Sequence, residues 1–148
     1  MDFDQAMDIA LEEARLALGE GEVPVGAVIL KNGDLISKAH NKREKDLSIT
    51  GHAEILAILE AEKSLGRWQL DGCQLIVTLE PCTMCAGAIA QSRIATLIYG
   101  AEDPAFGAFS TNLDPFSKGL YPSPLIYKGS KADDCKALLD EFFKKLRS

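Results

Sequence analysis

The stretch LIVTLEPCTMCAGAIAQSRIATLIYG, residues 75–100, decides the fold of this chain. Residues 75–79 form a short apolar run of the kind that becomes a buried strand. Pro81 then stands where the first turn of a helix would begin, and small, mostly apolar residues continue to Ser92. Residues 95–100 form a second apolar run. A strand, a helix and a strand in this order predict an α/β fold.

The same alternation continues on both sides of that stretch. Asn32-Gly33 is a strong hairpin-turn signal between two apolar runs, and Gly66 ends a further helix. The expected elements are a helix over 4–18, strands over 23–30 and 35–39, a helix from Thr50 or Gly51 to Gly66, a loop over 101–123, a strand over 125–127 and a helix over 132–146. An opening hairpin followed by alternating helices and strands predicts an α/β sandwich with a mixed sheet, folded as one domain over residues 1–148.

The composition is that of an ordinary compact domain. The chain has 148 residues, of which 47% are hydrophobic and 26% are charged, so it has enough apolar material to bury a core without disulfides. No apolar run reaches the roughly 18 residues of a membrane span. The N-terminus, Met1-Asp-Phe-Asp4, lacks the basic and apolar regions of a signal peptide. We therefore expect a cytoplasmic protein with no membrane partner.

The net charge of −6 and the pI near 4.9 lower the expectation of a nucleic-acid partner, because such proteins usually present a basic face to the phosphates. Two local clusters of basic residues remain. The first follows the hairpin and consists of Lys38, Lys42, Arg43 and Lys45; the second ends the last helix and consists of Lys144, Lys145 and Arg147. Together they form either a basic stripe on an acidic body, or a solvated loop and a helix end stabilised by its dipole.

The four cysteines divide into one close pair and two single residues. Cys82 and Cys85 are too close together for an ordinary structural disulfide, and their spacing suits a metal site or a redox dithiol. Cys73 and Cys135 have no such context. We expect both of them to be small core residues.

The residue types of a catalytic zinc site stand at the starts of two predicted helices. Catalytic zinc takes three protein ligands and keeps a fourth position for water. His52, Cys82 and Cys85 supply that set, and a helix N-terminus favours thiolates. Glu54 follows His52 by two residues and is the candidate acid and base. It would move protons from the water to a ring nitrogen and to departing ammonia, as hydrolytic deamination requires.

Neither motif alone is specific to a catalytic zinc site. A lone Cys-x-x-Cys fits a structural zinc site or a redox dithiol equally well, but a redox motif lacks a partnering His-x-Glu, and a structural site normally has four protein ligands. The only other histidine, His40, precedes Asn41 in a predicted loop. We expect it to be an exposed or hydrogen-bonded loop residue rather than a fourth ligand. The combination of motifs favours one catalytic Zn²⁺ per chain.

The two motifs together, H-x-E and P-C-x-x-C, form the signature of the cytidine deaminase superfamily. The chain resembles in particular the bacterial tRNA-specific adenosine deaminases. The stretches that carry the resemblance are Glu22–Val28, Gly51–Ile55, Thr78–Ala88, Tyr99–Ala101 and Phe142–Lys144. The resemblance implies a three-layer α/β/α sandwich with a mixed five-stranded sheet and a homodimer. It also implies hydrolysis of the wobble adenosine of a tRNA anticodon stem-loop to inosine.

The resemblance further implies how the purine is held. Asn41 would hydrogen-bond the base, and Val25 and Pro81 would line its pocket. The backbone N–H groups of Ala53 and Cys82 would lie near the substrate or the zinc-bound hydroxide. Taken without a substrate, Val25 is simply part of an apolar strand, and Asn41 shapes a turn.

Three more residues are implied to contact the rest of the RNA. Asp103 would contact the neighbouring nucleotide, and Phe142 and Phe143 would grip the splayed loop by stacking or packing, as RNA readers commonly do. The alternatives are a turn formed by Asp103 before Pro104 and a core position for at least one of the two phenylalanines, which share their helix with several leucines.

After Asp103 the sequence departs from that family. Members usually continue in a stretch resembling D-P-K-x-G, whereas this chain has Pro104-Ala-Phe-Gly107, and residues 120–124 replace an Asn-His pair. These positions lie on the side where the family holds RNA. Two other functions therefore stay open: a deaminase of a free nucleobase or nucleoside of the guanine, adenine or cytosine type, and a non-catalytic zinc-binding module.

Overall fold

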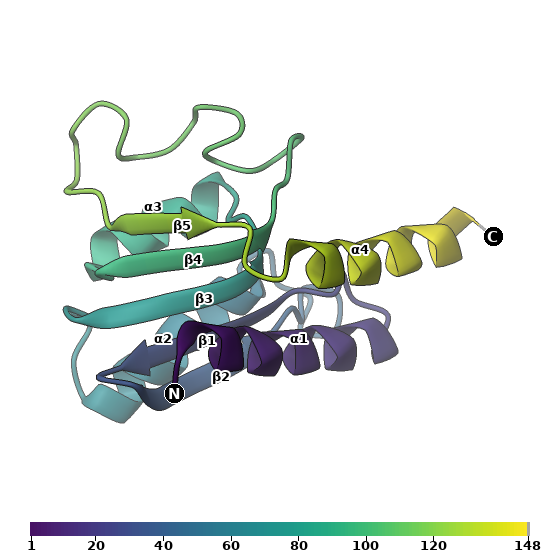
Figure 1. Cartoon of the computed structure of the whole chain (residues 1–148), viewed down its shortest axis with the longest axis horizontal. Helices are drawn as coiled ribbons and strands as arrows, with labels where there is room; N and C mark the ends of the chain where they lie inside the picture. Colours follow the sequence, from purple (N-terminus) through teal and green to yellow (C-terminus); the bar gives the residue numbers. More distant parts are fainter. Residues whose placement is uncertain (148) are drawn as a thin grey trace.

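The computed structural model describes residues 1–147 and contains four helices around a five-stranded sheet (Figure 1). Along the chain the elements are α1 (Phe3–Gly19), β1 (Gly26–Lys31), β2 (Asp34–His40), α2 (Ala53–Leu65), β3 (Cys73–Leu79), α3 (Thr83–Ser92), β4 (Thr96–Ala101), β5 (Leu125–Lys128) and α4 (Ala132–Arg147). This order confirms the predicted opening hairpin and the alternation that follows it.

The sheet is mixed, as predicted. Its strand order is β2-β1-β3-β4-β5; β1 runs antiparallel to both of its neighbours, whereas β3, β4 and β5 are parallel. The hairpin turn at Asn32-Gly33 has φ values of 53° and 79°, the left-handed backbone that a tight type I′ turn requires.

Helices cover both faces of the sheet, with α1 and α4 on one face and α2 and α3 on the other (Figure 1). Because side chains alternate along a strand, each strand contributes to two cores. The core under α1 and α4 includes Val28, Leu30, Ile76 and Ile98, and the core under α2 and α3 includes Ile29, Leu75, Val77 and Leu97. Cys73 and Cys135 are buried in these cores, as predicted. The expected three-layer α/β/α fold is confirmed.

The strand predicted over residues 23–30 begins later, at Gly26. The backbone before it is turned instead of extended, because the Val25 N–H donates to the carbonyl of Val23 at 2.9 Å and Pro24 has no N–H for a sheet. Gly26 is required where α1 crosses β1, since a Cβ there would overlap the Ala10 carbonyl. Residues 23–25 are thereby free of the sheet and border the cavity described below.

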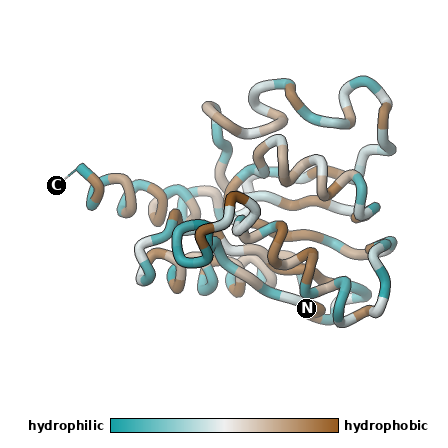
Figure 2. The backbone as a smooth tube through the Cα atoms, turned by 180° about the vertical axis from the view of Figure 1, so that it is seen from behind, coloured by the Kyte–Doolittle hydropathy of each residue, from teal (hydrophilic) through white to brown (hydrophobic). Residues whose placement is uncertain are grey.

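The loop expected over 101–123 is confirmed, with no regular helix or strand between β4 and β5 among the described residues. Helix α4 follows and projects past the end of the sheet (Figure 1), and hydrophilic and hydrophobic residues alternate along its turns (Figure 2). It buries only Cys135 completely. None of the helices described is long and apolar enough to cross a membrane.

Candidate metal and catalytic site

His52, Cys82 and Cys85 come together where α2 and α3 begin, although they are distant in sequence. The imidazole Nδ1 of His52 lies 3.7 Å from Sγ of Cys82 and 3.5 Å from Sγ of Cys85. His52 is the N-cap of α2, and its ring faces the thiols instead of capping the helix. The helix predicted over 81–92 starts two residues late, at Thr83, so Cys82 is its extended N-cap and only Cys85 lies in its first turn.

The spacing of these atoms suits a tetrahedral metal ion. With Zn–N near 2.05 Å and Zn–S near 2.3 Å, tetrahedral geometry separates the nitrogen and a sulfur by about 3.6 Å. The two observed separations lie on either side of that value, and the three ligand atoms all lie within 4.8 Å of one another. One imidazole and two thiols are also a common zinc ligand set. The group is therefore compatible with one zinc ion.

The pKa values of the triad are shifted in opposite directions by hydrogen bonds among its members. The neighbouring Cys85 thiol and the His52 imidazole donate to Cys82 and lower the pKa of Cys82 to about 4. That thiolate and burial together raise the pKa of Cys85, and hydrogen bonding to Cys82 raises the pKa of His52. The thiolate form that these neighbours favour at Cys82 is the form of cysteine that binds a divalent cation.

Glu54 lies beside the candidate metal ligands but is shielded from solvent. It occupies the first turn of α2 and is 4% exposed. Burial raises the pKa of Glu54 to about 7. A carboxyl group that titrates near neutral pH both accepts and releases a proton readily, as an acid–base catalyst must.

The triad opens into a cavity of about 650 Å³. Its walls come from the segments before β1 and before α2, the ends of β3 and β4, the loop after β4, and α4. The lining residues are Val23, Val25, Asn41, Arg43, His52, Ala53, Glu54, Leu79, Glu80, Cys82, Glu102, Asp103, Pro104, Ala105, Phe106, Leu139, Asp140 and Phe143. Most of the residues implied by the resemblance are therefore gathered around one cavity.

Two of those implied residues lie outside the cavity lining. Pro81 is buried beside it, and its carbonyl accepts a hydrogen bond from the Ala108 N–H at 2.9 Å. Phe142 is half-buried and packs edge to face on Phe143, with ring centroids 5.4 Å apart. The expectation that one of the two phenylalanines is a core residue is wrong, because α4 projects past the sheet and Phe143 stays 44% exposed.

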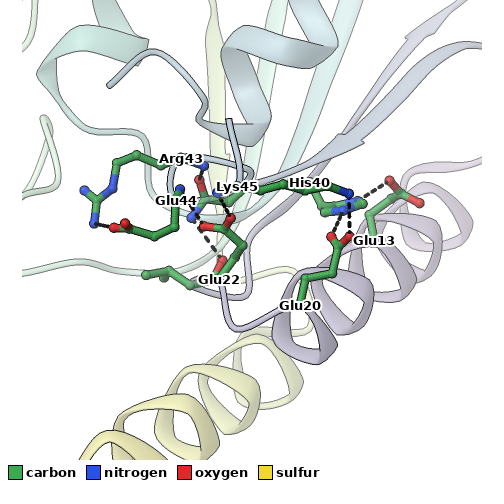
Figure 3. A network of polar contacts seen from close by, with 9 residues as sticks. Glu13, Glu20, Glu22, His40, Arg43, Glu44 and Lys45 are labelled. Atoms are coloured by element: carbon green, nitrogen blue, oxygen red, sulfur yellow. Dashed lines mark hydrogen bonds and ion pairs between the residues drawn. The ribbon is translucent and has the colours of Figure 1, made fainter. Parts of the chain in front are cut away.

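One wall of the cavity, to which Asn41 and Arg43 contribute, belongs to the segment between β2 and α2 and is held by a buried carboxylate. Glu22 is 2% exposed and accepts hydrogen bonds from the backbone N–H groups of Glu44 at 3.0 Å and Lys45 at 2.8 Å (Figure 3). Asn41 lies at the start of the same wall and is 7% exposed. Its side chain accepts from the Arg43 N–H at 3.2 Å and donates to the Val23 carbonyl at 3.3 Å.

Glu80 holds the opposite wall in the same way. It is 2% exposed, and its carboxylate accepts from the backbone N–H groups of Asp103, Phe109 and Ser110 at 3.0, 3.0 and 2.8 Å and from the Ser110 hydroxyl at 2.6 Å. A Cβ at Gly107 would overlap this carboxylate. In the sequence, Glu22 and Glu80 are each recognisable only as a charged residue at the edge of an apolar run.

His40 is neither a metal ligand nor a loop residue. It ends β2, is 9% exposed, and places Nδ1 3.0 Å from Glu13 and Nε2 2.6 Å from Glu20 (Figure 3). The predicted hydrogen bonding is confirmed, but the predicted loop position is wrong because the hairpin strand runs on to residue 40. Both ring nitrogens are engaged, so neither is available to a metal.

A second cavity, of about 720 Å³, lies away from the triad. It is bordered by the C-terminal part of α3 and the segment before β5, and Arg93 stacks over the Trp68 ring at 5.3 Å in it. Its lining contains no His or Cys. His52, Glu54 and Cys82 line the first cavity, and neither they nor Cys85 line the second.

Comparison with known proteins agrees with this site. A family model described as the cytidine and deoxycytidylate deaminase zinc-binding region matches residues 2–101. The chain is 42% identical to the tRNA-specific adenosine deaminase of Bacillus subtilis (strain 168) over 142 residues, 95% of this chain and 88% of that protein. It is 46% identical to the tRNA-specific adenosine deaminase of Rickettsia bellii (strain RML369-C) over 141 residues, 93% and 97% of the two chains.

Solved structures that superpose on this chain are also deaminases. A structure from studies of A-to-I editing by tRNA:A34 deaminases at the wobble position of transfer RNA superposes with a TM-score of 0.84 at 40% identity, covering 91% of this chain and 99% of that one. A guanine deaminase from Bacillus subtilis superposes with a TM-score of 0.67 at 36% identity, covering 77% and 72%. The resemblance that the H-x-E and P-C-x-x-C motifs carry is thus confirmed, and this chain belongs to the cytidine and deoxycytidylate deaminase family of zinc-binding proteins.

Proposed function

We propose that this chain is a single-domain, zinc-dependent hydrolytic deaminase that converts the wobble adenosine of a tRNA anticodon stem-loop to inosine. The observation that carries the choice of substrate is the extent of the cavity. It runs from the buried Glu54 at the metal ligands to exposed aromatic rings at its rim, Phe106 and Phe143. A free base would fill only the inner end, whereas a splayed RNA loop has further bases for the rim.

The proposed reaction exchanges the exocyclic amino group of the base for the oxygen of water and releases ammonia. Zn²⁺ held by His52, Cys82 and Cys85 would supply Lewis-acid chemistry and lower the pKa of water to about 7. The Glu54 carboxylate takes a proton from the attacking water and gives it to the ring nitrogen beside the reacting carbon. It then passes the second water proton to the amino nitrogen as the C–N bond breaks.

The remaining residues of the inner cavity would orient the base. Asn41 keeps one amide hydrogen and one lone pair beyond the bonds that it makes within the chain, so it is able to bond a purine edge. Val25 is 7% exposed and supplies an apolar wall. The N–H groups of Ala53 and Cys82 lie at the starts of α2 and α3, where backbone donors are free of intrahelical partners.

A deaminase of a free base or nucleoside is the second candidate. The 36% identity to a guanine deaminase structure favours it, and so does the acidic rim described below. The two functions share the inner site and differ in what occupies the outer cavity. Neutralising basic residues near the rim would weaken only the reaction on RNA.

The deciding experiment offers the purified protein an anticodon stem-loop that carries adenosine at the wobble position, together with a panel of free bases and nucleosides. Inosine in the RNA with no turnover of the panel is the expected result. Turnover of one small molecule with no inosine in the RNA would assign the second function. The Glu54→Ala variant serves as the control, and a non-catalytic zinc module would behave identically with and without that change.

We further propose a homodimer that acts in the cytoplasm. Leu47 and Ile49 lie two positions apart in the segment between β2 and α2, and they expose 91% and 79% of their surfaces. A second copy would remove them from water. Sedimentation analysis should give twice the chain mass, and Leu47→Asp combined with Ile49→Asp should shift it to the monomer. The cytoplasm is where the proposed substrate occurs and where the four free thiols would stay reduced.

A further inference from the structure

Phe106 is an apolar side chain held in water at the mouth of the active-site cavity. It lines the same cavity as His52 and Glu54, yet 74% of its surface is exposed. Exposing a whole aromatic ring forgoes the favourable burial that such rings usually obtain. The ring therefore offers a flat apolar face to whatever enters the cavity.

The loop that carries Phe106 is fixed to the metal site. The carboxylate of Asp103 accepts hydrogen bonds from the Ala105 and Phe106 N–H groups at 3.3 and 3.2 Å. The next residue, Gly107, forms a β-bridge with the metal ligand Cys82. The ring thus stands one residue from a backbone that pairs with the catalytic centre, so its distance from the reacting base is set by the fold.

The charges at the rim decide what kind of group the ring would meet. Glu102, Asp103 and Asp140 line the cavity around Phe106 and Phe143, and Arg43 is the single arginine or lysine among the described lining residues. Carboxylates repel phosphates, so the sugar–phosphate backbone gains little on this side. An unpaired base is uncharged and flat, and it stacks on an aromatic ring whatever its identity.

We propose that Phe106 determines how the RNA loop is seated, by stacking on an unpaired base that adjoins the base entering the metal site. The inference rests on the proposed function. Loss of one such stack is expected to lower kcat/KM by about 5- to 150-fold. Since stacking involves no net charge, this loss should not depend on salt.

The test compares the wild type with Phe106→Ala and Phe106→Trp on three stem-loops: one intact, one with an abasic site 5′ of the target and one with an abasic site 3′ of it. Phe106→Ala should lose activity on the intact RNA, whereas Phe106→Trp, which keeps an aromatic ring, should retain it. On one of the two abasic substrates the difference between Phe106→Ala and the wild type should shrink to less than about 2-fold, as expected when a shared contact is removed. Leu113→Ala is the matched control, because Leu113 is 66% exposed on the same loop but outside the cavity lining.

The outcomes separate this inference from the function on which it rests. A wild-type protein that deaminates no stem-loop overturns both. A wild-type protein that deaminates the RNA while Phe106→Ala matches it, or loses the same factor on all three substrates, overturns the role of Phe106 alone. Thermal unfolding of each variant should match the wild type, because the ring is exposed.

Discussion

The imidazole Nδ1 of His52 lies 3.5 Å from the Sγ of Cys85, although 33 positions separate the two residues along the chain. Each stands where a helix begins, and the two helices lie on the same face of the sheet. The separation is close to the roughly 3.6 Å that a tetrahedral zinc ion imposes on such a pair. The backbone therefore places these side chains at a spacing that is compatible with a zinc ion.

Purified protein should contain about one zinc per chain, and His52→Ala or Cys85→Ala should lose it. Catalytic zinc needs three protein ligands, and removing one leaves too few to hold the ion. Metal analysis by mass spectrometry measures the content. Cys73→Ala is the matched control, since Cys73 is equally buried but belongs to the core; zinc lost from that variant would contradict the assignment.

Replacing Glu54 by Gln should remove activity and leave the metal in place. General acid–base groups contribute about 10²- to 10⁴-fold to rate, and Glu54 is proposed to serve in two proton transfers, so the fall in kcat should lie near the upper end. Single-turnover kinetics with parallel zinc analysis measures both properties. Glu60→Gln changes the same residue type on the exposed face of α2. Equal activity of the two variants would exclude Glu54 as the proton carrier.

The grouping of the candidate metal ligands could be predicted from the sequence because its signals are local. His52 and Glu54 form one short motif, Cys82 and Cys85 form another, and hydrophobic periodicity gives the strands and helices around them. The bracing carboxylates could not be predicted in this way. Glu80 acts on backbone N–H groups 23 to 30 positions away, and only the folded chain shows which segments face each other. The projection of α4 past the end of the sheet could not be predicted either, because it depends on where the folded sheet ends.

Truncating Glu80 should destabilise the fold and disturb one wall of the cavity. The carboxylate accepts four hydrogen bonds in a buried position, and bonds to a charged group contribute about 1.5–3 kcal/mol each when they are removed singly. Glu80→Ala should therefore lower the free energy of unfolding by at least about 3 kcal/mol, measured by urea denaturation. Glu80→Gln, which keeps the shape of the side chain, should cost less. An unfolding midpoint unchanged in Glu80→Ala would refute the bracing role.

Replacing His40 by Ala should reduce stability but not the zinc content. The change leaves Glu13, whose side chain is 10% exposed, without its partner, and an unsatisfied buried polar group costs about 1–3 kcal/mol. Urea denaturation and metal analysis of one preparation test both halves. A variant as stable as the wild type but depleted of zinc would make His40 a ligand after all, against the geometry that engages both of its ring nitrogens.

Replacing Arg43 by Gln should weaken RNA binding at low salt and make the remaining affinity less sensitive to salt. Arg43 is the one arginine or lysine that lines the cavity among the described residues. Because the overall charge of the chain is −6, we expect this position to supply local attraction for the phosphates. Each phosphate contact on a single strand contributes about 0.7 to the slope of log affinity against log salt concentration, and the variant should lose about that amount.

Arg67→Gln is the matched control. The two arginine side chains are 48% and 47% exposed and each faces one carboxylate, but Arg67 lies outside the cavity lining. If both variants give the same slope of log affinity against log salt concentration, the attraction for phosphates arises elsewhere on the surface. A smaller slope in Arg43→Gln alone would explain how an acidic protein holds RNA at this edge of the cavity.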